Sequence, residues 1–314
     1  MNAVATGIGA DRDAPGAARE VLRRHGRTFF FASQLLGRTH ATRAATLYAF
    51  CRHVDNLADD AIDPDSARRA LAGVTNALLA GRAQDPWTNG LLSLQTSTGM
   101  KLAPALDLVA GVTSDLDAVR IADEATLVHY AYQVAGTVGL MMCAVLDVHD
   151  PRAQPFAIDL GIAMQLTNIA RDVGEDARMG RRYLPSSWIG EVSADAIATP
   201  DAALQRALRG GTRRLLEQAD RYYASGESGL AFLPARTRLA ILAAARMYQA
   251  IGTRIAANGF RSWDRRAVLS SSAKAGHAAR SVLSFALSPQ LHRRDAVHDP
   301  SLQVALASLH DRHG

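Results

Sequence analysis

The sequence predicts an all-α protein, and three observations support this prediction. Apolar residues recur at intervals of three and four through long segments and do not alternate. Alanine is abundant and aromatic residues make up only 6% of the chain, a composition that favours helices. The sequence shows no βαβ rhythm, internal repeat or low-complexity block. Because 314 residues contain no long polar linker, we expect one single-domain helical bundle.

Clusters of Gly, Pro and polar residues separate the predicted helices, namely GRAQDPWTNG near 81–90, STGMKLAP near 97–104, RRYLPSSWIGEVSADAIATPDA near 182–203 and GESGLAFLPA near 226–235. The expected helices span 16–36, 41–60, 65–82, 104–118, 123–147, 152–177, 201–224, 235–258 and 264–286. We expect the domain to cover 16–287, between a flexible tail at 1–15 and a poorly ordered tail at 288–314. The longest uncharged stretch, 130–146, is shorter than the ~20 apolar residues of a spanning helix, which predicts a buried core helix.

Charge and cysteine content narrow the class of protein. A net charge of +5 and a pI near 9.5 suit an anionic ligand, a nucleic acid or an anionic membrane surface. Nucleic-acid binding is disfavoured, since no run of five Lys or Arg and no aromatic-interleaved basic motif occurs. Cys51 and Cys143 lie far apart in apolar segments, as reduced core cysteines of a cytoplasmic protein do, and the N-terminus lacks the features of a signal peptide.

A polar stripe follows one predicted helix in the segment QLTNIARDVGED. Asn168, Asp172 and Asp176 are four residues apart, and Gln165 lies one turn earlier, so all four can face one space. A solvated helix face is the ordinary interpretation of such a stripe. The neighbouring residues are strongly apolar, however, which leaves less of this helix to face water.

A second acidic pair has the same spacing. Asp55 and Asp59 lie in YAFCRHVDNLADD, with Arg52 and Tyr48 one and two turns before them. Four carboxylates around one cavity would repel one another and would need cations, and hard oxygen ligands select Mg²⁺ or Mn²⁺. Such ions keep few protein ligands where the substrate brings phosphate oxygens, so diphosphate is the expected ligand, and Arg52 and Arg171 are placed to donate to it.

Other familiar sites are not predicted. The sequence contains no GxxxxGK[ST] loop, no GxGxxG after a strand, no CxxC or HExxH zinc pattern and no GxSxG nucleophile motif.

These motifs resemble the squalene and phytoene synthase family, most closely its bacterial phytoene synthases. The resemblance covers roughly 20–290, and its carriers are GRTFFFAS at 26–33, LYAFCRHVDNLADD at 47–60, YAYQVAGTVGLMM at 130–142 and QLTNIARDVGEDARMGRRYLPSSW at 165–188. One departure is Asn56, where related phytoene synthases usually carry an acid adjacent to the first aspartate. It affects only an auxiliary ligand, because the Asp55 and Asp59 spacing is intact.

The resemblance implies an isoprenoid synthase bundle with a central cavity, in which two aspartate-rich helices hold Mg²⁺ around a prenyl diphosphate. The implied metal ligands are Asp55, Asp59, Asp172 and Asp176, with Asn168 as a helper; together with Tyr130, the four acids are the implied catalytic residues. The implied substrate-binding residues are Phe29, Tyr48, Arg52, Gln165, Asn168, Arg171, Tyr248 and Arg265, with Arg266 as the alternative to Arg265.

The activity implied is head-to-head condensation of two geranylgeranyl diphosphates, through a cyclopropyl diphosphate, to phytoene. No nicotinamide cofactor is expected for this product. Condensation of farnesyl diphosphate to squalene, dehydrosqualene or hydroxysqualene remains an alternative, because cavity length decides between them. A non-catalytic helical scaffold is a second alternative, against which the retained acids argue. Water-insoluble tails predict peripheral membrane contact at the inner membrane face and handover to downstream carotenoid enzymes.

Overall fold

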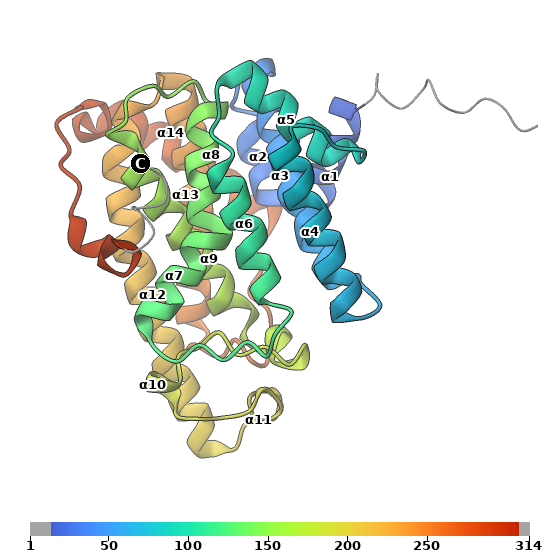
Figure 1. Cartoon of the computed structure of the whole chain (residues 1–314). Coiled ribbons are helices and arrows are strands. Elements are labelled where there is room, and N and C mark those ends of the chain that lie inside the picture. The colour runs from blue at the N-terminus through green and yellow to red at the C-terminus, as the bar shows by residue number, and fades with distance from the viewer. Residues whose placement is uncertain (1–13, 308–314) are drawn as a thin grey trace, which may run out of the picture.

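The computed structural model describes residues 14–307. Within this range every regular element is a helix, and one isolated bridge joins Arg120 to Arg182. The long helices form an upright bundle, with two short helices at its lower end (Figure 1). In chain order the elements are α1 (Ala14–His25), α2 (Arg27–Ser33), α3 (Arg38–Asp59), α4 (Pro64–Ala80), α5 (Pro86–Thr98), α6 (Ala103–Ser114), α7 (Glu124–Ala131), η1 (Tyr132–Gly136), α8 (Thr137–Val145), α9 (Ala153–Arg178), α10 (Ser186–Ile189), α11 (Ala194–Ala198), α12 (Ala202–Ser228), η2 (Gly229–Phe232), α13 (Ala235–Ala257), α14 (Ser271–Leu287), η3 (Pro289–His292) and η4 (Pro300–Leu306).

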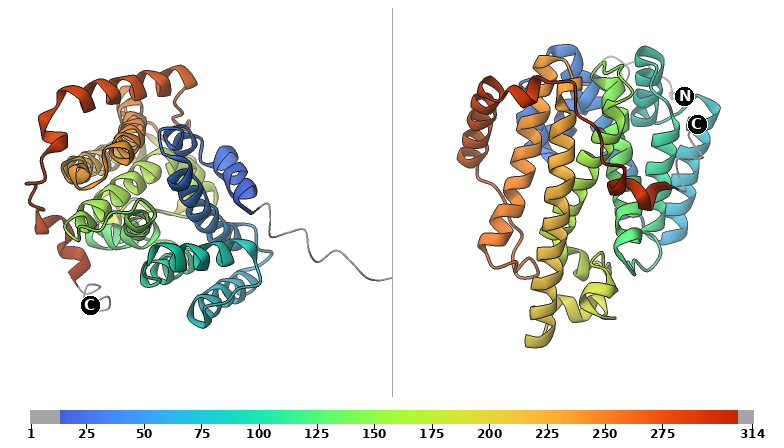
Figure 2. Two further views of the ribbon diagram at one scale, coloured as in Figure 1. Left: turned by 90° about the horizontal axis from the view of Figure 1, so that it is seen from above. Right: turned by 90° about the vertical axis from the view of Figure 1, so that its left-hand side faces the viewer.

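Helix α9 lies at the centre of the bundle. It packs against α8, α12 and α13, and seen from above it is enclosed by its neighbours (Figure 2). Most of its apolar side chains belong to the largest core cluster, among them Ile162, Leu166 and Ile169. The all-α prediction is therefore confirmed, and the predicted polar stripe lies on the most enclosed helix.

Two glycines allow α9 to approach α8 and the preceding turn η1 closely. A Cβ on Gly139 would lie 2.1 Å from the carbonyl oxygen of Ala157, and one on Gly161 would lie 2.3 Å from that of Ala135. Any side chain at either position would push the helices apart. Just before α8 the chain forms the π-turn η1, so the predicted continuous helix over 123–147 is interrupted there.

Helix α5 was not predicted, because its start was interpreted as a breaker. Asp85 is its N-cap, and its carboxylate accepts hydrogen bonds from the backbone N–H groups of Trp87 and Thr88. Pro86 follows at the first helical position, where a missing N–H has no cost. The sequence DPWT is therefore a helix start.

Two other predicted helices differ in extent. Gly26 divides the predicted helix at 16–36 into α1 and α2, and a Cβ there would meet the Tyr48 ring at 2.8 Å. The predicted helix at 264–286 begins only at Ser271, because Trp263 is buried in a preceding loop and the Ser270 side chain caps the helix.

The C-terminal segment packs against the bundle as far as the structure describes it, so the prediction of a poorly ordered tail is wrong for 288–307. The segment crosses the outside of the bundle (Figure 2). The Tyr222 hydroxyl donates to the Leu302 carbonyl at 2.6 Å, and His298 contacts Asp159 at 2.8 Å. The predicted tail at 1–15 lies almost wholly outside the described residues. Across residues 14–307, no helix has the length and apolar character needed to cross a membrane.

Candidate active site

The two acidic pairs line one pocket. Helix α3 contributes Asp55 and Asp59, and α9 contributes Asp172 and Asp176, to a cavity of about 240 Å³. The remaining lining residues are Ala58, Val112, Asp115, Tyr130, Gln165, Asn168, Ile169, Arg171, Arg181 and Tyr183. Residues more than a hundred positions apart in sequence thus share one space, as the family resemblance implied.

Arginines contact the acids on both sides of this pocket. The Nε atom of Arg171 donates to Asp172 at 2.9 Å, and Arg266 contacts the same carboxylate at 2.8 Å. On the α3 side, Arg181 donates to Asp59 at 2.9 Å. Planar guanidinium groups match both carboxylate and phosphate oxygens, so the same arginines can bind a diphosphate.

Burial and mutual repulsion raise the pKa of two of the acids. Desolvation, reinforced by the charge of Asp172, raises the pKa of Asp176 to about 8. Desolvation also raises the pKa of Asp55 to about 6, opposed by Arg52 and increased by Asp59. The Asp55 side chain is 44% accessible, so solvent screens part of the effect that raises its pKa. These acids would be stabilised in their charged form by an added cation.

The donor set fits a divalent cation only together with a ligand. Within residues 14–307, no group of three His, Cys, Asp or Glu side chains lies close enough to hold one ion. The Oδ1 atom of Asn168 is buried without a hydrogen-bond partner, which leaves an oxygen donor available on the pocket wall. Mg²⁺ usually retains waters and takes one or two carboxylates plus substrate phosphate oxygens. The pocket can therefore hold Mg²⁺ with a diphosphate, but it is not a closed cage of protein ligands.

Three polar residues of the pocket, Asp115, Arg181 and Tyr183, were not predicted to act in the site. The Tyr130 hydroxyl donates to Asp115 at 2.8 Å, and the Tyr130 ring stacks on Tyr183 with centroids 5.0 Å apart. Desolvation raises the pKa of Asp115 to about 6. Asp115 follows α6 and has no acid four residues away, so spacing gave no signal. Arg181 and Tyr183, in contrast, lie inside the quoted motif at 165–188.

The predicted aromatic residues form a group beside the polar pocket. The Phe29 ring lies 5.0 Å from Tyr248 and 6.2 Å from Tyr48, between centroids, which joins α2, α3 and α13. Tyr248 also hydrogen-bonds with Arg171, which places the group next to the acids of α9.

The structure places Arg266, and not Arg265, at the acids. Both arginines are exposed, but Arg266 contacts Glu175 at 3.3 Å as well as Asp172, whereas Arg265 forms no ion pair with an acid within residues 14–307. The loop that carries both arginines lies directly on α9, since a Cβ on Gly174 would meet the Trp263 carbonyl oxygen at 2.3 Å. A substrate-binding role for Arg265 stays a prediction, and the geometry favours its neighbour.

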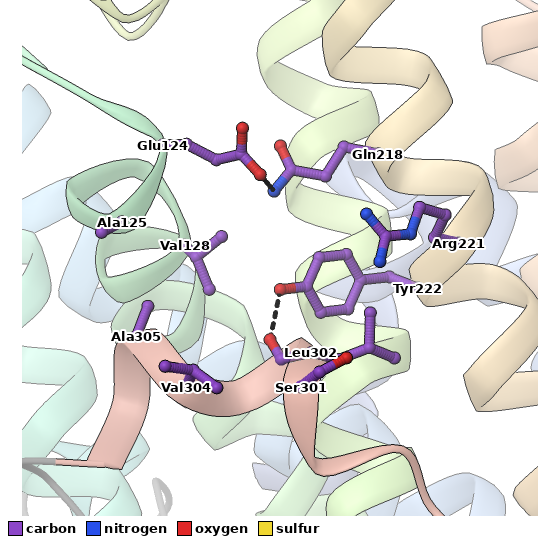
Figure 3. Close-up of a pocket in the computed structure, with 10 residues that line it drawn as sticks. All are labelled: Glu124, Ala125, Val128, Gln218, Arg221, Tyr222, Ser301, Leu302, Val304 and Ala305. Carbon is purple, nitrogen blue, oxygen red and sulfur yellow. Dashed lines mark hydrogen bonds between the residues drawn. The ribbon is translucent and has the colours of Figure 1, made fainter.

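A larger hollow, of about 330 Å³, lies between α7, α12 and η4 (Figure 3). Its polar contacts are internal: Gln218 donates to Glu124, and Tyr222 donates to Leu302. None of the residues predicted to act in the site lines it. Size therefore does not identify the functional pocket in this molecule, whereas the chemistry of the lining does.

Comparisons with known proteins agree with this geometry. The family model of squalene/phytoene synthases matches residues 22–273. The chain belongs to the squalene/phytoene synthase family. It is 36% identical to a phytoene synthase of Cereibacter sphaeroides over 87% of this chain and 80% of that one. It is also 36% identical to a 15-cis-phytoene synthase of a Paracoccus strain, over 82% of this chain and 87% of that one.

Solved structures show the same fold. A dehydrosqualene synthase crystallised with a ligand superposes with a TM-score of 0.76 at 25% identity, covering 88% of this chain and 97% of that one. A squalene synthase from Alicyclobacillus acidocaldarius superposes with a TM-score of 0.66 at 20% identity, covering 79% and 95%. The helical isoprenoid synthase fold expected from the sequence is confirmed.

Proposed function

We propose that this protein is a phytoene synthase. It joins two geranylgeranyl diphosphates head to head, through a cyclopropyl diphosphate, and releases diphosphate. The observation that carries the proposal is the shared pocket of Asp55, Asp59, Asp172 and Asp176, in a chain 36% identical over most of its length to phytoene synthases. Neither acidic pair alone would distinguish this pocket from a solvated helix face.

The acids and Asn168 are the proposed ligands of Mg²⁺ or Mn²⁺. When bound, these ions neutralise the charge that develops on a departing diphosphate. Asn168 adds a neutral oxygen from the same helix as Asp172, and its buried Oδ1 atom has no other partner in the described part of the chain. The raised pKa values of Asp55 and Asp176 mean that the protein alone stabilises their charged forms poorly. A bound cation would therefore favour the deprotonated carboxylates.

Arginines and polar residues on the pocket wall are the proposed diphosphate clamp. Arg171 and Arg266 already contact Asp172, and Arg52 lies 3.9 Å from Asp55. Each can turn one donor toward phosphate while it keeps the carboxylate in place. Gln165 lines the same wall. Tyr130 is held by Asp115, so its ring and hydroxyl are fixed where the two acidic helices face each other.

The group of Phe29, Tyr48 and Tyr248 is the proposed entry to the hydrocarbon region. A volume of about 240 Å³ is below the ~300–1,000 Å³ of pockets that bury drug-sized ligands, so the acidic pocket accommodates head groups and not two prenyl chains. Aromatic faces attract cationic charge and exclude water, which protects an allylic cation from capture.

Product analysis tests the proposal. Purified protein is incubated with geranylgeranyl diphosphate and Mg²⁺, without a reductant, and the lipids are extracted. A C40 hydrocarbon is expected, and its absence from correctly folded protein would contradict the proposal. A chelator control should abolish the product, and adding back Mg²⁺ or Mn²⁺ should restore it.

The C15 alternative keeps one specific observation in its favour, the 0.76 TM-score with a dehydrosqualene synthase. Competition between equal concentrations of the C20 and C15 diphosphates in one assay discriminates between the two substrates. We expect C40 product to dominate. Dominant C30 product would transfer the assignment to the farnesyl diphosphate reaction, and no hydrocarbon from either substrate would favour the scaffold alternative.

Since both prenyl substrate and hydrocarbon product partition into lipid, we also propose that the protein acts at an anionic membrane surface and hands its product to later carotenoid enzymes there. The net charge of +5 supports the electrostatic part of this contact. Flotation of the protein with anionic vesicles, compared with neutral ones, tests it.

A further inference from the structure

Helix α14 presents an unusual outer face. Nine large apolar side chains are exposed in the described residues, and four of them, Val268, Val282, Leu283 and Leu287, lie on α14 or just before it. Leu283 is 59% exposed and Leu287 is 70% exposed. Exposed apolar residues that stand alone need no explanation, but a contiguous group marks an interaction surface.

These side chains form one continuous stripe. Ala275, Ala279, Val282, Leu283 and Ala286 are exposed and follow one another at helical spacing, so they lie on the same face. Leu287 extends the stripe at its C-terminal end. The opposite face of α14 packs against α13 and α2, and the helix lies at the edge of the bundle (Figure 2).

The charges around the stripe are almost all positive. Helix α14 contains Lys274 and Arg280 and no Asp or Glu. Neither residue forms an ion pair with an acid in residues 14–307, and Arg27 of α2 lies near enough to Lys274 to add to the positive charge there. From 261 to 294 the single acid is Asp264, which pairs with Arg261.

We propose that the outer face of α14 is the surface that docks this protein on an anionic lipid bilayer. Leu283 and Leu287 enter the boundary between head groups and acyl chains, while Lys274 and Arg280 contact the anionic head groups. An amphipathic helix that lies in the interface combines these two contributions. The inference deepens the proposed function, because it names the surface through which lipid-soluble substrate and product would pass.

The position of α14 fits this role. It contacts α2, which carries Phe29 of the aromatic group, and it follows directly after the loop that brings Arg266 to Asp172. A bilayer on this face would therefore be adjacent to the proposed hydrocarbon region. A second copy of the chain fits the face less well, since a symmetric pair would bring the Lys274 and Arg280 cations of both copies together.

Flotation with matched variants tests the surface. The double variant Leu283→Asp/Leu287→Asp is compared with Leu79→Asp, which changes an equally exposed leucine, 69% accessible, on α4. With vesicles of about one-third anionic lipid, we expect the double variant to bind at least tenfold more weakly and Leu79→Asp to bind like the wild type. A Lys274→Gln/Arg280→Gln variant should lose about fivefold in vesicle affinity for each cation removed. Added salt should also weaken vesicle binding by the wild type.

Two control measurements keep this test separate from the reaction. Turnover of detergent-solubilised geranylgeranyl diphosphate should be the same in the double variant and the wild type. If neither protein turned over this substrate, the proposed function would fail, but the flotation result would still stand. Equal flotation of the double variant and the wild type would overturn the inference. So would a wild-type dimer that dissociates in the double variant without loss of flotation, because the face would then be a self-interface.

Discussion

Helix α9 carries one fully buried aspartate near its start and two half-buried aspartates near its end, and their environments are opposite. Asp159, near its N-terminal end, has 0% exposure and accepts hydrogen bonds from Ser225 at 2.5 Å and Gln303 at 2.8 Å, with His298 also at 2.8 Å. Asp176, about five turns later, faces the pocket and has a pKa raised to about 8 by desolvation and by Asp172.

The difference separates a structural acid from a functional one. The protein itself supplies every donor that Asp159 needs, and two of them come from the C-terminal segment. Asp172 is paired with Arg171 and Arg266. The Asp176 carboxylate, in contrast, has no hydrogen bond or ion pair within residues 14–307, which costs stability but leaves it available to a cation and a phosphorylated ligand. Burial alone does not make an aspartate a candidate ligand.

The largest effect is expected from Asp172→Asn. Losing a carboxylate ligand should remove several kcal/mol of stabilisation of the leaving diphosphate, so turnover should fall on the order of 10³-fold. The unfolding free energy should fall by no more than about 1–2 kcal/mol, because Arg171 and Arg266 lose a carboxylate partner while repulsion with Asp176 is relieved. Turnover and urea denaturation are measured on the same preparation. Normal product formation by this variant would contradict the metal role.

Asp159→Ala should show the opposite pattern. Three donors would lose their shared acceptor, and breaking such a buried network typically costs about 3–5 kcal/mol of unfolding free energy. Urea denaturation measures this loss. Turnover of the protein that remains folded should be close to that of the wild type, since Asp159 does not line the acidic pocket. If stability were unchanged while turnover collapsed, Asp159 would have to be reassigned to the site.

Comparing Arg266→Gln with Arg265→Gln tests which of the two arginines belongs to the site. Arg266 contacts Asp172 at 2.8 Å, and a charge-assisted hydrogen bond to a diphosphate contributes about 1.5–3 kcal/mol, so kcat/KM should fall roughly 10–100-fold. Arg265→Gln should change it less than about threefold. The reverse ranking would support Arg265, the residue predicted from the motif.

The last prediction concerns the pH dependence of stability in metal-free protein. The folded pKa of Asp176 is raised from 3.8 to about 8, so its contribution to stability is complete below about 4 and is lost as the pH rises through 8. The melting temperature should decline over this window by less in Asp176→Asn than in the wild type. Mg²⁺ binds the deprotonated acid, so the increase in melting temperature on adding Mg²⁺ should grow with pH. An Mg²⁺ effect that is flat from pH 6 to about 8.5 would contradict the assignment.

Local sequence patterns predicted the long helices well, because periodic burial and caps act over a few residues. One exception also has a local cause. Asp85 and Pro86 were interpreted as a break, although an N-cap followed by proline starts a helix. Other errors required distant partners: the 261–270 loop replaces the start of a predicted helix because Trp263 is buried against Gly174.

The candidate site divides in the same way. The two DxxxD pairs and Asn168 were recognisable, since helical spacing places each set on one face. Asp115 has no such spacing, and only the packing of α6 beside η1 and the hydrogen bond from Tyr130 bring it to the pocket. The sequence also could not show that Arg266, and not Arg265, contacts Asp172. The direction of a side chain in a loop depends on what the loop contacts.

The sequence by itself determined the helical architecture and the two sets of acids, because these depend on spacing along single helices, and the resemblance of its four motifs indicated the family. The tertiary structure decided which groups come together. It places α3 and α9 on one pocket, gives Asp159 hydrogen-bond donors from Ser225 and Gln303, and leaves an apolar face of α14 uncovered. The physical reason is that desolvation and Coulomb interactions depend on distances through space, which are set only when the whole bundle has packed.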